Sequence, residues 1–263
     1  MNILVCIKQV PETNEVKIDP VTGVLDRNGV ESKMNPYDLY ALETALRLRE
    51  EQGGTITVIS MGPPQAKQVI REAFAMGADR GILVSDRRFG GADVLATSYT
   101  LSQGIRKAGN FDMILCGKQT IDGDTAQVGP EIAEYLSYPS VCNVRKILSI
   151  EEKAICVEMD MPHAIETLRV AFPCLLTVEK DIYMPRLPSY IKKEASKGQE
   201  IEMYSLQDFE DQDENRYGLN GSPTQVQRIF PPETDKKREI WDEKDHVLAE
   251  KLYGKMEELK FIL

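Results

Sequence analysis

The most informative run of this sequence is Leu115-Cys-Gly-Lys-Gln-Thr-Ile-Asp-Gly-Asp-Thr-Ala-Gln-Val-Gly-Pro-Glu131. It begins within a short apolar run, residues 113–116, that is typical of a buried strand, and it leads into a predicted helix over residues 131–136. Pro130 suits the first turn of that helix. The free backbone N–H groups and the positive end of the helix dipole would then face the carboxyl end of the strand, where a phosphate or a pyrophosphate is stabilised.

Two interpretations of this run have similar weight on spacing alone. Small residues occur in its second half, at Gly123, Thr125, Ala126 and Gly129. Small residues let a phosphate ligand approach the backbone, and Thr125 and Gln127 would donate side-chain hydrogen bonds. Alternatively the run is only a tight connection, in which Asp122 and Asp124 cap backbone N–H groups. A magnesium site is less favoured, because no third carboxylate accompanies these two.

Apolar runs alternate with amphipathic segments through the first half of the chain. Strands are predicted over residues 3–7, 55–60, 82–84 and 113–116, and helices over residues 36–51, 64–76 and 92–107. Asn35 is expected to cap the first helix, with Pro36 at its first position. This alternation predicts a doubly wound α/β fold with a mostly parallel, Rossmann-like sheet. Ligands of such sheets bind beyond the carboxyl ends of the strands, here in the loops over residues 8–12, 61–64, 85–91 and 117–129.

The pattern changes after Pro139. Four strands with no helix between them are predicted over residues 144–150, 154–159, 165–171 and 175–178, which indicates an antiparallel insert. A ligand-binding domain is therefore expected over residues 1–190. Residues 191–263 hold too little patterned apolar sequence for a core, and would form a disordered tail or an extended arm with a terminal helix over residues 241–260. Five apolar residues favour an arm that packs on a partner subunit: Tyr204, Leu206, Phe230, Ile240 and Trp241.

The composition argues against several function classes. The chain carries a net charge of −10, whereas sequence-independent binding of nucleic acid needs a basic surface. No apolar run approaches the roughly 18 residues of a membrane helix, and the start does not resemble a signal peptide, so a cytoplasmic protein with no membrane partner is expected. The 5 cysteines are scattered and the 2 histidines lie far apart, which favours buried thiols and no metal site. Neither G-x-G-x-x-G after the first strand nor G-x-x-x-x-G-K-[ST] occurs, so a conventional dehydrogenase or NTPase is disfavoured.

The run from Gly117 to Pro130, followed by Tyr138-Pro-Ser140, resembles the signature of the β subunit of electron-transferring flavoproteins. Further runs are similar to the same family: Val5-Cys-Ile-Lys-Gln-Val-Pro11, Met34-Asn-Pro-Tyr-Asp38, Ser60-Met-Gly-Pro-Pro-Gln65, Ala73-Phe-Ala-Met-Gly-Ala-Asp-Arg-Gly81, Glu166-Thr-Leu-Arg169 and Pro185-Arg-Leu-Pro188. Together these runs cover most of residues 1–190. The resemblance implies a subunit that carries electrons only as part of a complex, with no activity of the chain alone.

The family has two branches, which differ in the nucleotide that the β subunit holds. The form Gly123-Asp-Thr-Ala-Gln-Val-Gly-Pro130 resembles the electron-splitting branch. That branch holds FAD, which accepts a hydride from NADH and passes electrons to ferredoxin and to the α-subunit flavin. In the other branch the β subunit is a scaffold that buries AMP. A third hypothesis, a nucleotide-binding sensor of the stress-protein type, is disfavoured by the predicted arm and antiparallel insert.

The resemblance also implies site residues and partners. The adenosine, the pyrophosphate and the flavin of FAD would lie against Cys6, Lys8, Gln9, Val10, Asn35, Pro36, Tyr37, Asp38, Met61, Gly62, Gly117, Gln119, Asp122, Gly123, Asp124, Thr125, Ala126, Gln127, Val128 and Gly129, with the loop from Lys8 near the flavin. No residue of the chain is expected to be catalytic, since the flavin does the chemistry. The implied partners are the α subunit, ferredoxin, and a flavin dehydrogenase of the acyl-CoA or the 2-hydroxyacid (lactate) type.

Three residues are expected at partner interfaces. Glu166 and Arg169 lie on a predicted strand, where they are more typical of a surface or interface ion pair than of catalysis. Leu187 resembles the residue by which the family anchors its dehydrogenase. An ordinary linker ordered by its prolines is an equally weighted alternative for the run around Leu187.

Overall fold

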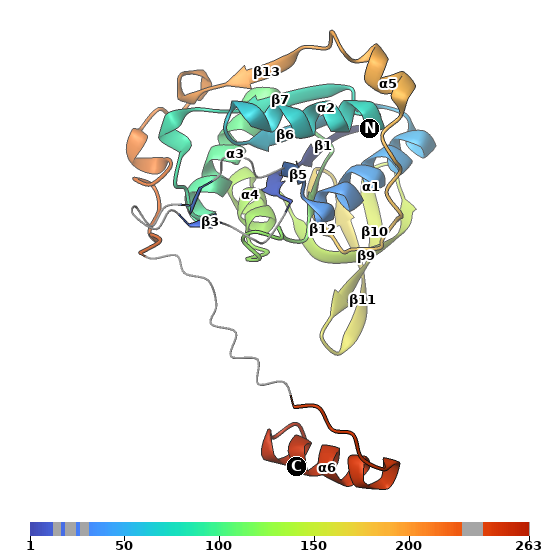
Figure 1. Cartoon of the computed structure of the whole chain (residues 1–263). Helices are drawn as coiled ribbons and strands as arrows, with labels where there is room; N and C mark the ends of the chain where they lie inside the picture. Colours follow the sequence, from blue (N-terminus) through green and yellow to red (C-terminus); the bar gives the residue numbers. More distant parts are fainter. Residues whose placement is uncertain (13–16, 19–24, 27–31, 228–238, 263) are drawn as a thin grey trace. The chain divides into compact units, whose positions relative to one another are not determined.

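One nine-stranded sheet organises the fold, with the strand order β11-β10-β9-β12-β8-β1-β6-β7-β13 (Figure 1). The structure, a computed structural model, describes residues 1–12, 17–18, 25–26, 32–227 and 239–262. The strands of the sheet are β1 (Asn2–Cys6), β6 (Thr55–Met61), β7 (Arg80–Val84), β8 (Met113–Gly117), β9 (Ser140–Ile150), β10 (Ala154–Met161), β11 (Ala164–Ala171), β12 (Cys174–Val178) and β13 (Ile201–Tyr204). Two short pairs lie outside it: β2 (Gln9–Pro11) with β5 (Ser32–Met34), and β3 (Lys17–Ile18) with β4 (Leu25–Asp26).

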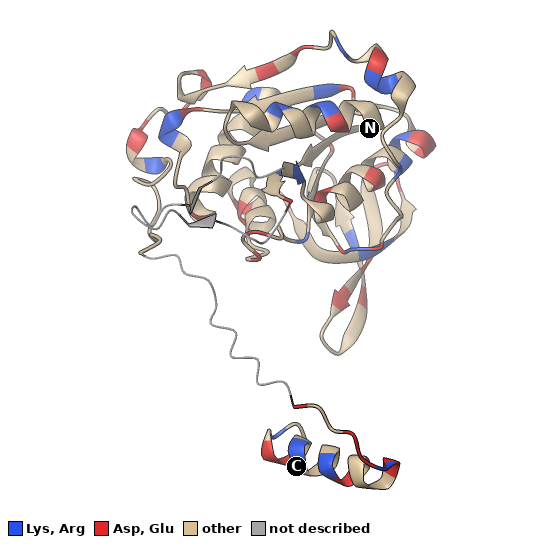
Figure 2. Cartoon of the chain, in the orientation of Figure 1, with Lys and Arg blue, Asp and Glu red and all other residues tan. Residues whose placement is uncertain are grey.

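Helices cover both faces of this sheet. The helices α1 (Pro36–Gln52) and α2 (Lys67–Met76) share one core with the strands, and α3 (Val94–Ala108) and α4 (Val128–Leu136) share the other. Alternate residues of a strand point to opposite faces, so Ile3 of β1 lies in the core of Leu42, whereas Leu4 lies in the core of Ile105. The central strands β1, β6 and β8 hold no charged residue, and charges of both signs are interspersed over the surrounding helices (Figure 2). This arrangement confirms the predicted doubly wound, mostly parallel sheet.

The helices begin and end close to their predicted positions. The helices predicted over residues 36–51 and 92–107 are α1 and α3, with ends shifted by one or two residues. The helix predicted over residues 64–76 starts as a 3₁₀ turn, Pro64–Ala66, before α2. The helix predicted from residue 131 already begins at Val128. The amino end of α4 therefore lies inside the run predicted to bind phosphate.

The insert after Pro139 is only partly antiparallel. β10 pairs antiparallel with β9 and β11, as predicted. β12 was expected to pair antiparallel as well, but it lies between β8 and β9 and is parallel to both. All five of its residues are buried, which suits a central position in the sheet. The β10–β11 hairpin takes the place of a crossover helix, so the lack of a helix before β12 did not indicate its direction.

The first compact unit extends to Gln227, beyond the boundary expected at residue 190. β13 adds a ninth strand, parallel to β7. After β13 in the chain, the side chains of Leu206, Phe209 and Tyr217 are buried. The ring centroids of Tyr217 and Phe89 lie 5.5 Å apart. Residues 191–227 therefore belong to the sheet-containing unit, because spaced aromatic side chains rather than a periodic pattern anchor them.

The second compact unit is Arg228–Leu263. Its helix α6 (Asp245–Glu258) starts four residues after the predicted Trp241, and none of its residues is buried. Phe230 lies outside the described residues. The packing of this unit on a partner stays a prediction. Among the described residues, no helix has both the length and the hydrophobicity of a membrane span.

Candidate functional site

Most of the predicted cofactor residues gather at the carboxyl edge of the sheet. β1 lies between β6 and β8, and Cys6 is in register with both Ile59 and Cys116. These parallel strands therefore end at the same edge. Met61 ends β6 and Gly62 follows it, the loop from Lys8 follows β1, and the run from Gly117 begins at the last residue of β8.

Two buried polar side chains join these loops to one another. Oδ2 of Asp38 accepts a hydrogen bond from the backbone N–H of Lys8 at 2.7 Å, and Oδ1 accepts one from Nδ2 of Asn35 at 2.9 Å. Nδ2 of Asn35 also donates to the carbonyl oxygen of Gln119 at 2.9 Å, and its Oδ1 accepts from the N–H of Ile121 at 3.2 Å. The loops after β1 and β8 are thus held by residues at the start of α1.

The structure gives Asn35 and Asp38 contacts within the protein, and their contacts with a cofactor stay a prediction. Asn35 was expected to cap α1, but its side chain makes no capping bond and ties α1 to the β8 loop instead. Asn35 is fully buried and Asp38 is 5% exposed, and both bond within the protein. Burial raises the pKa of Asp38 to about 7, although bonds from Asn35 and Lys8 oppose that rise. These residues hold the loops after β1 and β8 in place.

Gly117 is required where β8 passes the start of α1. A Cβ atom built on Gly117 would lie 2.6 Å from Oδ1 of Asp38 and 2.6 Å from the carbonyl carbon of Tyr37. We expect Gly117→Ala to lower the free energy of unfolding by about 1–3 kcal/mol, the usual cost of overpacking. Urea unfolding measures this, with Gly198→Ala as control because nothing lies within 4 Å of a Cβ there. Equal stability of the two variants would contradict this account of Gly117.

An ion pair joins the β1 loop to the β8 loop. Nζ of Lys8 lies 2.8 Å from both carboxylate oxygens of Asp122, and the two side chains are 44% and 33% exposed. Partial burial opposes ionisation of Asp122, but Lys8 outweighs it and lowers the pKa of the carboxyl. The second aspartate, Asp124, accepts a bond from the side chain of Gln119. The Lys8 ammonium thus offsets the charge by which Asp122 would repel a phosphate.

The backbone before α4 has an unusual conformation. Asp124 and Ala126 have φ values of 55° and 56°, in the left-handed region that non-glycine residues rarely adopt. Such backbone costs about 1–3 kcal/mol per residue and clusters at functional sites. Gln127, with φ −105° and ψ −26°, is right-handed. A left-handed residue followed by a right-handed one points successive N–H groups into a common concavity, which suits an anion.

The amides at this end of α4 remain available. Within the described part of the chain, the N–H groups of Thr125 to Gly129 donate to no protein acceptor, and no side chain caps the helix. Gly123, Thr125 and Gln127 are exposed. Free amides, the positive end of a helix and small side chains are the features that a pyrophosphate requires. The residues present therefore fit the phosphate or pyrophosphate group of a nucleotide.

Gly129 faces the sheet and not the solvent. It is buried, and a Cβ atom built on it would lie 2.6 Å from Cγ2 of Thr177 on β12. Val128, its partly buried neighbour, packs against the α3 and α4 core. Gly129 thus lets the first turn of α4 lie close to the strands, and would act on a ligand through the position of the helix.

The remaining predicted residues lie around the same edge. Gln9 and Val10 belong to β2, and Val10 is buried, whereas Pro36 and Tyr37 are partly buried at the start of α1. The hydrogen bond with Cys6, together with burial, raises the pKa of Cys116 well above its ordinary value, so this thiol stays neutral. The sequence did not single out Ser60 of β6, whose buried Oγ has no hydrogen-bond partner among the described residues. A serine near the carboxyl end of a predicted buried strand is the sequence pattern that would have indicated Ser60.

The three predicted interface residues lie away from this edge. Glu166 and Arg169 are exposed on β11, the outermost strand. They do not pair with each other, because Nη2 of Arg169 lies 2.6 Å from Oε2 of Glu151. Leu187 is 88% exposed. A hollow of about 310 Å³ lies elsewhere, near Asp79 at the amino end of β7, and none of the predicted site residues lines it.

The chain is similar to known proteins over most of its length. The family model described as electron transfer flavoprotein domain matches residues 22–208. An electron transfer flavoprotein subunit beta of Thermoanaerobacterium thermosaccharolyticum is 51% identical over 243 residues, which cover 92% of each chain. The caffeyl-CoA reductase-Etf complex subunit CarD of Acetobacterium woodii is 50% identical over 233 residues, or 88% of each chain. Protein FixA of Sinorhizobium fredii is 44% identical over 238 residues, which are 88% of this chain and 84% of FixA. The chain therefore belongs to the electron transfer flavoprotein family, as a β subunit.

Proposed function

We propose that this β subunit binds FAD at the carboxyl edge of its sheet and, with an α subunit, oxidises NADH. The observation that carries the proposal is the uncapped amino end of α4, where left-handed Ala126 precedes a series of free amides. A pyrophosphate supplies acceptors for several such amides at once. The Lys8–Asp122 pair supports the proposal, since it offsets one of the two negative charges beside the ligand.

Each part of the site has a role in this proposal. Bound FAD would supply hydride acceptance and electron transfer. The amides of Thr125 to Gly129 would hold the pyrophosphate, and Met61 and Gly62 would lie beside the adenosine. Gln9 and Val10 would lie near the flavin, and neither side chain is a general acid or base. Asn35 and Asp38 hold the loops after β1 and β8, through the bonds described above.

The partners follow from the same proposal. Electrons would pass to a low-potential carrier of the ferredoxin type and, through the α-subunit flavin, to a flavin dehydrogenase of the acyl-CoA or the 2-hydroxyacid type. The name of CarD, a subunit of a caffeyl-CoA reductase-Etf complex, supports a partner that acts on an acyl-CoA. Glu166, Arg169 and Leu187 would contact partners, and residues 228–263 would pack on the α subunit. We place this complex in the cytoplasm.

Two alternatives use the same edge of the sheet. AMP would place its single phosphate at the end of α4, and the β subunit would then be a scaffold for the flavin of the α subunit. A stress-type nucleotide sensor would need no redox partner, and similarity to electron transfer flavoprotein subunits gives it no support. The bound nucleotide separates the first function from both alternatives, because only the first places a flavin in this chain.

The flavin content of the purified heterodimer tests the proposal directly. We expect two FAD molecules per heterodimer, measured by visible absorbance and by chromatography of the released cofactors. We also expect anaerobic NADH to bleach flavin absorbance in a stopped-flow experiment, because hydride transfer needs only a nicotinamide stacked on an accessible flavin. One FAD and one AMP would leave the scaffold function, and two flavins that NADH does not bleach would exclude NADH oxidation.

A further inference from the structure

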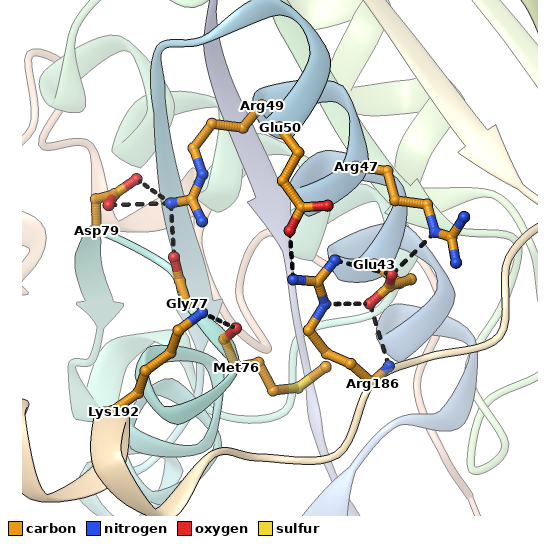
Figure 3. A network of polar contacts seen from close by, with 9 residues as sticks. All are labelled: Glu43, Arg47, Arg49, Glu50, Met76, Gly77, Asp79, Arg186 and Lys192. Atoms are coloured by element: carbon orange, nitrogen blue, oxygen red, sulfur yellow. Dashed lines mark hydrogen bonds and ion pairs between the residues drawn. The ribbon is translucent and has the colours of Figure 1, made fainter.

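A network of ion pairs joins Arg186, which precedes Leu187 in the sequence, to α1 (Figure 3). Its centre is Glu43 of α1, whose side chain is only 2% exposed. Nε and Nη2 of Arg186 donate to the two oxygens of Glu43 at 2.8 and 3.0 Å, and the backbone N–H of Arg186 donates at 3.1 Å. Nη1 of Arg186 reaches Glu50 at 2.6 Å. Arg186 thus binds α1 through its side chain and its backbone together.

Because Glu43 is buried, loss of its contacts with Arg186 would cost stability. Burial alone opposes ionisation of this carboxyl, but the bonds from Arg186 outweigh it and lower the pKa of Glu43. A buried charge that loses its partner is strongly destabilising. Any conformation in which Arg186 leaves Glu43 is therefore disfavoured. A second arginine, Arg47, also reaches Glu43, at 3.0 Å, but it belongs to α1 itself.

Residues 184–192, which we call the Leu187 segment, are fixed beyond Leu187 as well. The backbone N–H of Ser189 donates to the carbonyl oxygen of Ala75 on α2 at 2.8 Å. Nζ of Lys192, in α5 (Tyr190–Ala195), donates to the carbonyl oxygen of Met76 at 3.1 Å (Figure 3). The segment is therefore attached to α1 on one side of Leu187 and to α2 on the other. Leu187, between the two attachments, is 88% exposed.

We propose that Arg186 and Glu43 are positioning residues, which hold the Leu187 segment in the conformation that docks a flavin dehydrogenase, an inference that rests on the proposed docking by Leu187. Glu43 is buried and acts only through Arg186. A segment ordered before binding loses less conformational entropy on docking. If the segment adopted the docking conformation for only a fraction of the time, the apparent affinity for the dehydrogenase would fall by that fraction.

The variants that test this inference are Arg186→Gln, Arg186→Lys and Arg47→Gln. Arg186→Gln removes the bidentate contact and the charge, whereas Arg186→Lys keeps the charge and loses the fork geometry. Arg47→Gln is the matched control, because it removes an arginine from the same carboxylate, and the other contact of Arg47, with the Tyr183 ring, lies outside residues 184–192. Glu50→Gln adds a milder change, since Glu50 is 54% exposed.

Amide hydrogen exchange on the whole heterodimer measures the order of the segment. We expect exchange over residues 184–192 to be about tenfold faster in Arg186→Gln, which corresponds to a tenfold larger open fraction. Arg186→Lys and Glu50→Gln should be intermediate, and Arg47→Gln should match the wild type. Exchange that is equal in Arg186→Gln and Arg47→Gln would overturn the inference, whatever the dehydrogenase assays show.

Docking is measured by kinetics with an acyl-CoA dehydrogenase and with a flavin-dependent 2-hydroxyacid dehydrogenase. We expect Arg186→Gln to raise the KM for the accepted dehydrogenase about tenfold at unchanged kcat. Electron transfer from the heterodimer to a small dye should be unchanged. Faster exchange without a change in KM would overturn the positioning role. Leu187→Ala tests the proposed docking separately from the positioning role of Arg186 and Glu43. An unchanged KM in that variant with both dehydrogenases would overturn the proposed docking itself.

Discussion

Replacing Gly129 by alanine is expected to empty the proposed FAD site and lower the flavin content by close to one FAD per heterodimer. The added Cβ would lie 2.6 Å from Cγ2 of Thr177, which is much closer than non-bonded carbon atoms pack. The first turn of α4 must then move away from the sheet, and its free amides move with it. Hydrogen bonds weaken steeply outside their normal geometry, so a shift of about 1 Å is enough to lose the pyrophosphate.

A second substitution separates this cause from general destabilisation. Thr177→Ser removes Cγ2 but keeps the hydroxyl oxygen that accepts a bond from the N–H of Asn143 at 3.1 Å. The double variant of Gly129→Ala and Thr177→Ser is therefore expected to regain FAD, and Thr177→Ser alone should retain it. Gly198→Ala is the control for the substitution itself, because a Cβ there meets nothing within 4 Å.

The measurement is chromatography of the cofactor released from gel-filtered heterodimer, which distinguishes FAD from AMP. If Gly129→Ala lowers thermal stability but retains all of its FAD, the amino end of α4 does not hold the cofactor. If the double variant stays empty, contact with Thr177 is not the reason for the loss.

The central part of the sheet could be predicted from the sequence because its strands are apolar on both faces. Runs such as Ile3–Ile7 in the printed sequence leave no polar face, which fits only a strand covered on both sides. The direction of β12 could not be predicted, because it depends on which distant strands it meets after the β10–β11 hairpin. The place of Tyr204, Phe209 and Tyr217 in the first unit was missed for a related reason, since single aromatic residues in an irregular segment show no period.

At the candidate site, the sequence located the edge but not the function of each side chain. Alanine gives no signal of a left-handed backbone, so the conformation at Ala126 could not be predicted. Lys8 and Asp122 are 114 positions apart, and only the register of β1 against β8 brings them together. Asn35 and Asp38 lie where the resemblance implies cofactor contacts, but their burial shows that they bond to protein loops.

The burial of Asp38 predicts a pH dependence of stability that Asp38→Asn should remove. The pKa of this carboxyl is raised from 3.8 to about 7, chiefly by burial. Between these values the folded protein binds a proton that the unfolded chain has released, so stability falls as pH rises from about 4 to 7. Each pKa unit is equivalent to about 1.4 kcal/mol, so the full change is on the order of 4 kcal/mol.

The comparison to make is the difference in Tm between Asp38→Asn and the wild type, measured from pH 5 to pH 8. Asparagine stays neutral, but its single amide oxygen cannot take the place of both carboxyl oxygens that accept bonds from Lys8 and Asn35. The Tm of the variant should therefore be below that of the wild type at pH 5, which is its disadvantage. That disadvantage should shrink or reverse as pH rises, because only the wild type must then bury a charge. A shift of several degrees across this range is expected, at about 2–4 °C per kcal/mol.

Asp86→Asn is the control that shows whether the pH dependence of the Tm difference comes from the burial of Asp38. Hydrogen bonds from Arg88 lower the pKa of Asp86 to about 2, so this carboxyl is ionised in both the folded and the unfolded chain above pH 5. Its replacement should change Tm by the same amount at every pH in the range. A flat Tm difference for Asp38→Asn as well would mean that Asp38 is ionised throughout, with its bonds from Lys8 and Asn35 outweighing its burial. The carboxylate would then be a permanent anchor of the β1 loop, and the attachment of that loop to α1 would not depend on pH.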